Sequence, residues 1–235
     1  MNKIKIGKFL SSKGYGSRKE IKEAIKNKMI SEDNVIIENF NSLVNPRKVL
    51  VKGEKVEFYD KINIVINKPK GYVCTRSGIN SIFQLLPKIW LNRKPKVNTA
   101  GRLDKDTSGM LIITDDGNFL HKIISPKYKL SKVYKVKVEK KISINVKQIF
   151  ESGGLIIKNE KKPCKPVLFN QIDSFNVILT MHEGKYHQIK KMFSMCDNKV
   201  VELSRIQLGS LSIENLKLGT WRELTEKERK LLFRD

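Results

Sequence analysis

A polar loop that runs directly into a continuous apolar segment most constrains the fold of this chain. Gly101 and Gly109 bracket a short segment that holds two aspartates and an arginine, and the apolar residues 110–113 follow at once. A short apolar run of this kind is typical of a strand buried within a sheet. Functional groups are often carried on loops that such rigid elements hold in place. The loop is therefore the first candidate for a functional site.

Strand and helix patterns interleave along residues 61–235 without the regular order of a βαβ fold. Residues 132–139 alternate cleanly, with Tyr134 and two valines on one face and lysines on the other, as in a half-buried strand. We expect the other strands at 62–67, 111–114 and 175–181, and helices at 118–124, 186–195 and from Thr225 onward. This mixture predicts an α+β domain with a mixed, mostly antiparallel sheet.

Residues 1–60 are expected to form a separate, smaller module. A short helix is predicted over 4–10, and a second helix begins after Ser17, because Ser17 and Glu20 form a capping box. We expect short β segments at 35–37, 49–51 and 56–58. The sequence therefore predicts a helix-plus-hairpin module at 1–60, joined to a larger domain at 61–235 through a junction near residues 59–61.

The second predicted helix carries a row of basic side chains. Arg18, Lys22 and Lys26 follow one another at i, i+4 spacing, and Lys19 lies alongside. Like charges at this spacing repel and lower helix stability, unless an anion neutralises them. RNA phosphates would do so, and these four residues are the candidate RNA-binding row. The alternative is a solvated face in a lysine-rich protein.

The net charge of +23 favours a polyanionic partner, and we expect nucleic acid. A compositional bias toward lysine is the alternative. A membrane partner is not expected, because no long basic amphipathic helix with Trp or Phe on its apolar face is evident. Cys74, Cys164 and Cys196 are scattered and form no Cys-x-x-Cys pair. This usage argues against disulfides or a zinc site and favours a cytoplasmic protein.

Two segments imitate other sites. His182 and His187 flank a glycine and lie five residues apart, whereas a helical zinc motif needs i, i+4 spacing, so no metal site is expected. Residues 106–109 match the Asp-Thr-Ser-Gly of aspartic proteases, but those enzymes pair two such loops and only one is present here. No phosphate-binding loop or dinucleotide fingerprint occurs, so no nucleotide cofactor is expected.

Four segments, in order, resemble the motifs of pseudouridine synthases. Residues 101–109 resemble the catalytic motif of that family. Residues 67–73, 132–136 and 183–193 resemble its first motif, its tyrosine strand and its third motif. Residues 1–60 resemble the αL RNA-binding motif that a small-subunit ribosomal protein shares with tyrosyl-tRNA synthetases. The resemblance spans nearly the whole chain and points to the ribosomal small-subunit pseudouridine synthase A group and its large-subunit relatives.

The resemblance implies a role for four side chains around a central cleft. Asp104 would be the catalytic carboxylate, which attacks the sugar of a uridine or removes a sugar proton. Tyr134 would stack on the uracil, and Lys190 would pair with Asp104, with Lys191 as the rival for that role. Arg102 would enter the RNA stack in place of the extruded nucleotide. No metal or other cofactor is implied.

The rest of the loop, Asp106 to Ser108, is expected to brace it, although Arg102 could instead bridge Asp106. The family's usual Val-Asn-Gly turn is replaced near residues 31–34, where Asn34 is expected in the left-handed conformation. Lysine replaces the family's arginine at Lys190.

The expected function is isomerisation of one uridine of ribosomal RNA to pseudouridine by a monomeric enzyme, acting on RNA or on a pre-ribosomal particle. The small-subunit RNA is favoured, large-subunit RNA is the alternative, and a non-catalytic ribosome-assembly factor is a more distant one.

Overall fold

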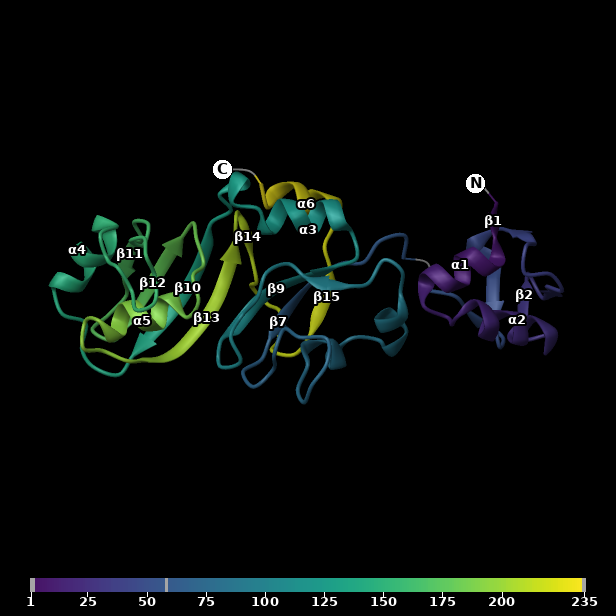
Figure 1. Ribbon diagram of the computed structural model, residues 1–235, viewed down its shortest axis with the longest axis horizontal. Coiled ribbons are helices and arrows are strands. Elements are labelled where there is room, and N and C mark those ends of the chain that lie inside the picture. The colour runs from purple at the N-terminus through teal and green to yellow at the C-terminus, as the bar shows by residue number, and fades with distance from the viewer. Residues whose placement is uncertain (1–2, 58, 234–235) are drawn as a thin grey trace. The chain divides into compact units, whose positions relative to one another are not determined.

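The computed structural model describes residues 3–57 and 59–233, and its contacts divide the chain into two compact units (Figure 1). The first unit contains the chain up to Ile62 together with Phe83–Asn98 and Thr114–Gly117. The second contains Asn63–Ile82, Thr99–Ile113 and the chain from Asn118 onward. The functional boundary at residues 60 and 61 stays a prediction.

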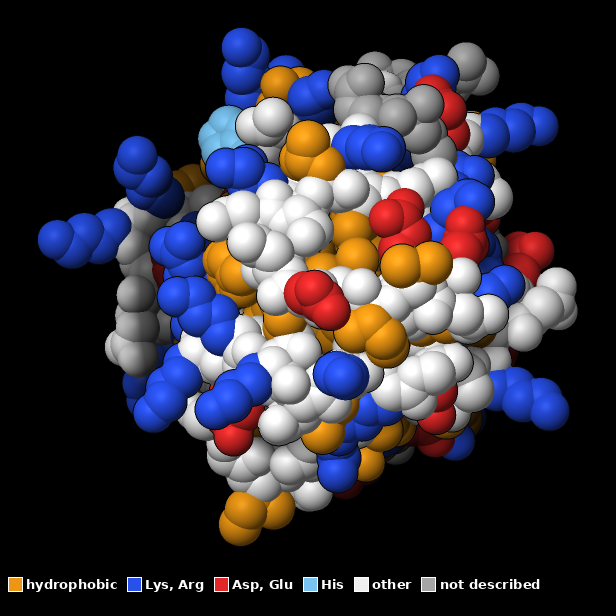
Figure 2. All heavy atoms as spheres, turned by 90° about the vertical axis from the view of Figure 1, so that its right-hand side faces the viewer, with side chains coloured by type: hydrophobic (Ala, Val, Ile, Leu, Met, Phe, Trp, Pro, Cys, Tyr) orange, Lys and Arg blue, Asp and Glu red, His pale blue; other side chains and the backbone are white. Residues whose placement is uncertain are grey.

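The N-terminal part of the first unit packs two helices against small sheets. Its elements are β1 (Ile4–Lys5), α1 (Ile6–Lys13), α2 (Arg18–Lys26), β2 (Ile30–Glu32), β3 (Val35–Ile36), β4 (Leu43–Val44), a 3-10 turn (Pro46–Lys48), β5 (Val49–Val51) and β6 (Glu54–Lys55). Strands β3-β2-β5-β6 form one sheet, and β1 pairs with β4. The core includes Ile6, Phe9 and Leu10 of α1 and Ile21 and Ile25 of α2. Figure 2 shows the face that lies on the right-hand side of Figure 1, where Lys and Arg side chains are prominent.

Several expectations for this module are confirmed, and others shift by a few residues. The capping box forms, with Ser17 Oγ accepting from Glu20 N and Glu20 accepting from Ser17 N. The first helix starts at Ile6 rather than at residue 4, and it ends where Gly14 adopts a left-handed φ of 93°. Asn34 is left-handed, as expected, with φ of 68°. The strand expected at 56–58 is wrong over 56–57, because the hairpin partner of β5 lies earlier, and Phe58 is outside the described residues.

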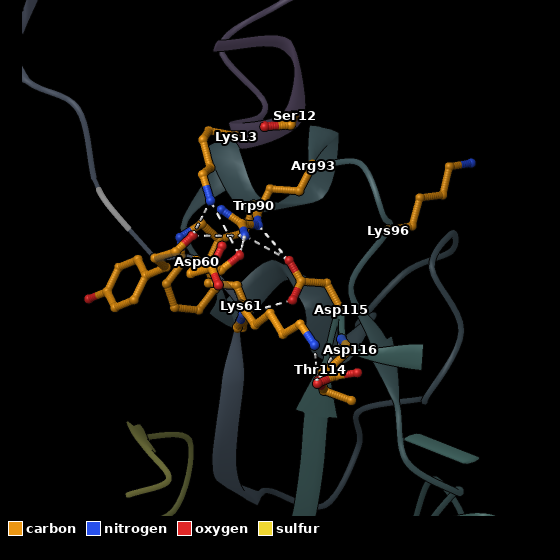
Figure 3. Close-up of polar contacts among 12 residues, drawn as sticks. Ser12, Lys13, Asp60, Lys61, Trp90, Arg93, Lys96, Thr114, Asp115 and Asp116 are labelled. Carbon is orange, nitrogen blue, oxygen red and sulfur yellow. Dashed lines mark hydrogen bonds and ion pairs between the residues drawn. The ribbon is translucent and has the colours of Figure 1, made fainter. Parts of the chain in front are cut away.

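A buried ion pair fixes the segment that leads out of this module (Figure 3). Two guanidinium nitrogens of Arg93 lie 2.8 and 2.7 Å from Asp115 Oδ2, and both side chains are almost fully buried. Asp115 Oδ1 accepts from Ile62 N at 2.7 Å. Lys13 and Arg93 donate to the carbonyl oxygens of residues 59 and 60. The expected junction is thus held by two cations, and burial lowers the pKa of Lys13.

One nine-stranded sheet dominates the second unit, with the central order β11-β12-β10-β13-β9-β7-β15. Its strands are β7 (Asn63–Lys68), β8 (Asn98–Thr99), β9 (Ser108–Thr114), β10 (Lys132–Val138), β11 (Leu168–Gln171), β12 (Asn176–Met181), β13 (Val200–Leu208), β14 (Leu211–Ser212) and β15 (Trp221–Glu223). Strands β9 and β13 run parallel, whereas β10 is antiparallel to both of its neighbours. The expected α+β class with a mixed, mostly antiparallel sheet is confirmed.

Helices cover this sheet at two places and create two cores (Figure 1). The helices are α3 (Gly117–Ile124), α4 (Asn145–Ser152), α5 (Gln188–Ser194) and α6 (Glu226–Leu231), with 3-10 turns at Ile82–Leu85, Lys88–Asn92 and Pro126–Tyr128. Side chains of α4 and α5, including Phe150 and Phe193, pack with β10 and β12 in one core. Residues of α3 and of the C-terminal segment form the other, where Phe119 lies edge-on to Phe233. No described helix is both long enough and apolar enough to cross a membrane.

Candidate active site

Strand β9 holds the polar loop at a fixed place in the sheet. Gly109 pairs with Arg205 of β13, and a β-carbon on Gly109 would lie only 2.2 Å from the Arg205 carbonyl oxygen. Gly109 also has a φ of 107°, a conformation that side chains disfavour. The second bracketing glycine therefore allows β9 and β13 to approach each other closely. Thr107 N then donates to Asp104 O at 3.1 Å and closes a turn that presents the Asp104 carboxylate.

Buried Lys68 donates hydrogen bonds to backbone carbonyls of this loop. Its side chain is fully buried at the end of β7, and its Nζ donates to Thr107 O at 2.7 Å and to Pro69 O at 3.1 Å. The Lys105 carbonyl lies 3.5 Å from the same nitrogen and also accepts from Gly71 N at 2.7 Å. Burial lowers the pKa of Lys68, partly opposed by nearby acidic groups. The sequence placed this lysine in the family's first motif but gave it no role.

Lys190 of α5 lies between the two carboxylates of the loop. Its Nζ is 3.1 Å from Asp104 Oδ2 and 2.5 Å from Asp106 Oδ1. Partial burial alone would lower the pKa of Lys190, but the two carboxylates outweigh it and leave that pKa raised. Partial burial likewise opposes ionisation of Asp106, yet its bond to Lys190 leaves the Asp106 pKa lowered. Lys191 instead donates to Lys158 O at 3.1 Å, so the structure brings Lys190 rather than its rival to Asp104.

The pairing of Asp106 with Lys190 also corrects the alternative in which Arg102 bridges Asp106. Among the described residues, Arg102 forms no ion pair, and its exposed side chain lines the rim of a cavity. Ser108 Oγ lies 3.4 Å from Leu203 O, and Thr107 is buried, in keeping with a bracing role for these two residues.

His187 and Tyr186 were not predicted as parts of the site. His187 Nε2 lies 3.5 Å from Asp104 Oδ1, and the His187 backbone is left-handed at the start of α5. The ring of Tyr186 stacks on His187, with centroids 3.8 Å apart and planes 19° apart, and Tyr186 is 69 % exposed. Both residues lie within residues 183–193, the segment that resembles the family's third motif, and this position was the available signal. The other histidine of the apparent zinc motif, His182, contacts Lys129 O instead.

These groups surround a cavity of about 460 Å³ in the second unit. Tyr134 of β10 is half-buried in its wall, where Met181 and Leu203 add apolar surface. The carboxylates that line the cavity are those of Asp104 and Glu183. Glu183 Oε1 already accepts hydrogen bonds from Lys165 N and Gln188 Nε2. A carboxylate next to a cation and near an aromatic ring suits nucleophilic or base chemistry on a nucleotide taken out of its stack.

The predicted RNA-binding row belongs to the other unit. Arg18, Lys19, Lys22 and Lys26 are all exposed on α2, as the helix pattern predicted. The structure therefore gathers Asp104, Tyr134, Lys190 and Arg102 around one cavity of the second unit.

Residues 62–195 match a sequence model of the family described as RNA pseudouridylate synthase. The chain belongs to this family, and the predicted class of enzyme, an RNA pseudouridine synthase, is confirmed.

Individual relatives match over nearly the full length of the chain. An uncharacterized RNA pseudouridine synthase of Bacillus subtilis is 37 % identical over 97 % of this chain and 98 % of its own. The ribosomal small subunit pseudouridine synthase A of Vibrio cholerae is 34 % identical over 96 % of this chain and 97 % of its own. A crystal structure of a pseudouridylate synthase superposes with a TM-score of 0.69 at 31 % identity, covering 97 % of this chain and 99 % of that one.

Proposed function

We propose that this enzyme converts one uridine of small-subunit ribosomal RNA to pseudouridine, with Asp104 as the catalytic carboxylate. The observation that carries the proposal is the shared cavity, in which Asp104 lies between Lys190 and His187 and near Tyr134. The choice of subunit is supported by the full-length similarity to the ribosomal small subunit pseudouridine synthase A of Vibrio cholerae.

Each side chain around the cavity has a distinct proposed role. Asp104 breaks the bond between the uracil nitrogen and the ribose, either by attacking the sugar or by removing a sugar proton. The freed uracil rotates and rejoins the ribose through one of its carbons. That carbon loses a proton and the former glycosidic nitrogen gains one, so product and substrate are isomers. Tyr134 stacks on the uracil, and its hydroxyl assists the removal of that proton. Lys190 orients the Asp104 carboxylate, because its Nζ lies 3.1 Å from Asp104 Oδ2.

The remaining parts of the proposal concern RNA binding. Arg102, exposed at the rim of the cavity, replaces the extruded nucleotide in the RNA stack and offsets part of the few kcal/mol that unstacking costs. The row of Arg18, Lys19, Lys22 and Lys26 binds phosphates, which accounts for unpaired positive charge on α2. The partner is ribosomal RNA or a pre-ribosomal particle in the cytoplasm, and the enzyme acts as a monomer without a nucleotide cofactor.

The test compares Asp104→Asn with Asp106→Asn on small-subunit ribosomal RNA. Pseudouridine formation should disappear in Asp104→Asn while RNA affinity stays near that of the wild type. Asp106→Asn removes the neighbouring carboxylate of the same loop, which contacts Lys190 and not the substrate, and should slow turnover without abolishing it. Turnover by Asp104→Asn would exclude the proposed mechanism.

Mapping pseudouridines in ribosomal RNA from cells that lack the protein tests the choice of subunit. A single missing pseudouridine in the small subunit supports the proposal, and one missing in the large subunit favours the alternative substrate. Unchanged RNA, together with an inactive purified wild type, would favour a non-catalytic assembly factor.

A further inference from the structure

A second cavity, of about 450 Å³, lies in the first unit and shares no lining residue with the cavity around Asp104. Its lining combines one aromatic ring, that of Phe40, with the glycine backbone of α1 and the side chains of four cationic residues. None of the roles assigned so far uses Phe40. Phe40 packs against the hydrophobic core of the module on one side, and its partly exposed ring lies among cations.

The backbone of α1 holds the Phe40 ring in place. Gly7 N donates to Phe40 O at 3.0 Å, and Ile6 N donates to Ser42 O at 2.9 Å, so the segment containing Phe40 is fixed to the start of the helix. A β-carbon on Gly7 would lie 2.2 Å from Cζ of the ring, so the ring rests directly on the glycine backbone. Phe40 is still only partly buried. The ring is therefore a fixed surface that remains accessible.

Positive charge surrounds this ring. Lys5, Lys8, Arg18 and Lys94 line the cavity, and all four are exposed. The guanidinium carbon of Arg18 lies 5.5 Å from the ring centroid, and Nζ of Lys22 lies 5.8 Å from it.

The cations around the cavity have no carboxylate to balance them. No acidic residue lines the cavity, and none of these five cations forms an ion pair within the described part of the chain. Lys94 is fixed next to α1, because its backbone N donates to Ser12 O at 3.0 Å. The repulsion among these cations is relieved when an anion binds between them.

We infer that this cavity binds one unpaired nucleotide of RNA, with its base stacked on Phe40 and its flanking phosphates on Lys5, Lys8 and Lys94. The inference rests on the proposed action on RNA and extends it to a contact outside the catalytic cavity. Phosphates alone would need only the basic row of α2, whereas a partly exposed aromatic ring adds affinity only for a base that is free of its pairing partner. Exposed Arg18 moves aside to admit the base and then contacts its other face or a phosphate.

The test measures binding of the full-length protein to a labelled single-stranded RNA and to the same RNA in a blunt duplex. Phe40→Leu should weaken single-strand binding by roughly tenfold, as expected for one lost base–aromatic stack, and leave duplex binding almost unchanged. Phe40→Tyr keeps the ring and should restore single-strand binding. This rescue separates stacking from damage to the fold, which a thermal melt of both variants checks.

An abasic scan of the single strand locates the stacked base. One position should weaken wild-type binding by roughly tenfold when its base is removed, and the same removal should have no effect in Phe40→Leu. A loss at that position that is equal in wild type and variant would overturn the inference, as would equal single-strand affinity of the two proteins. Selective capture of an acidic peptide by the wild type, with no effect of the variant on RNA, would also overturn it.

Turnover of the wild type on ribosomal RNA is measured in parallel, so that the two proposals can fail separately. If the wild type is active and Phe40→Leu binds RNA as tightly as the wild type, the proposed nucleotide pocket is refuted and the proposed function still holds. If the wild type is inactive and Phe40→Leu binds the single strand tenfold more weakly, the nucleotide pocket is supported and the proposed function is refuted.

Discussion

Replacing Lys68 by methionine tests how the catalytic loop is held. Methionine has nearly the same length and fills the same buried space, so the substitution removes the ammonium group without opening a large cavity. In the wild type that group donates to Thr107 O at 2.7 Å and Pro69 O at 3.1 Å, with Lys105 O at 3.5 Å. Two of these carbonyls belong to the loop that carries Asp104.

The expected loss of stability follows from these contacts. Two well-formed hydrogen bonds are lost, and each buried carbonyl left without a donor costs about 1–3 kcal/mol. The contact at 3.5 Å is at the limit of a hydrogen bond and adds little. Removing the charge from a fully buried site offsets part of this loss in the free energy of unfolding, because a buried ammonium is itself poorly solvated. We expect a net destabilisation of about 2–4 kcal/mol, or a fall in melting temperature of roughly 5–15 °C for a protein of this size.

Thermal melting and single-turnover kinetics check this prediction. The rate of pseudouridine formation should fall at saturating enzyme, because the loop no longer fixes the Asp104 carboxylate, while RNA affinity stays near that of the wild type. Lys70→Met is the matched control, since Lys70 is an exposed lysine of the same segment. A Lys68→Met protein that melts within about 1 °C of the wild type would refute the role given to these hydrogen bonds.

Three further predictions concern the groups around Asp104. Lys190→Met should lower the rate constant by roughly a hundredfold. Because the Lys190 pKa is raised above the ordinary 10.5, the rate of the wild type should not fall below that pH through loss of the Lys190 proton. Asp106→Asn should lower the free energy of unfolding by no more than about 1 kcal/mol, since the Asp106 side chain is 69 % exposed. The Asp106 pKa is lowered, so this difference should be present above about pH 4 and vanish as the pH falls below it, as urea titrations would show. Tyr186→Leu should weaken RNA binding by roughly tenfold with little change in the rate on bound RNA, and an unchanged affinity would remove Tyr186 as a stacking surface for RNA.

Elements with a strong local pattern could be predicted from the sequence. The alternation at 132–139 corresponds to β10, the capping box predicted at Ser17 forms, and a helix with its own capping box begins after Thr225, where one was expected. Elements without such a pattern were missed. Strand β13 (Val200–Leu208) lies between two neighbours in the sheet, but its polar residues hide its period, and α4 (Asn145–Ser152) starts without a side-chain cap.

In the site, too, residues within a recognisable motif were predicted, whereas residues that only tertiary contacts bring into place were missed. The Asp104–Lys190 pair followed from motif resemblance, although the two residues are far apart in the sequence. His187 was missed because it was weighed only as a zinc ligand, and its left-handed backbone shifts the start of α5 to Gln188. Lys68 was missed because a lysine is expected at the surface, whereas this one is fully buried and hydrogen-bonded to carbonyls that only the folded loop brings to it.

A lysine at position 190 also changes what the neighbouring carboxylate does. An ammonium is a compact charge with three donors, so it can contact carboxylates from two residues, whereas an arginine fork favours bidentate contact with one. Lys190 Nζ contacts Asp104 Oδ2 and Asp106 Oδ1 at once. Asp106 thereby fixes the lysine from the solvent side, since its own side chain is the more exposed of the two. The lysine at this position therefore gives Asp106 a positioning role, and Lys190→Arg should lower the dependence of the rate on Asp106.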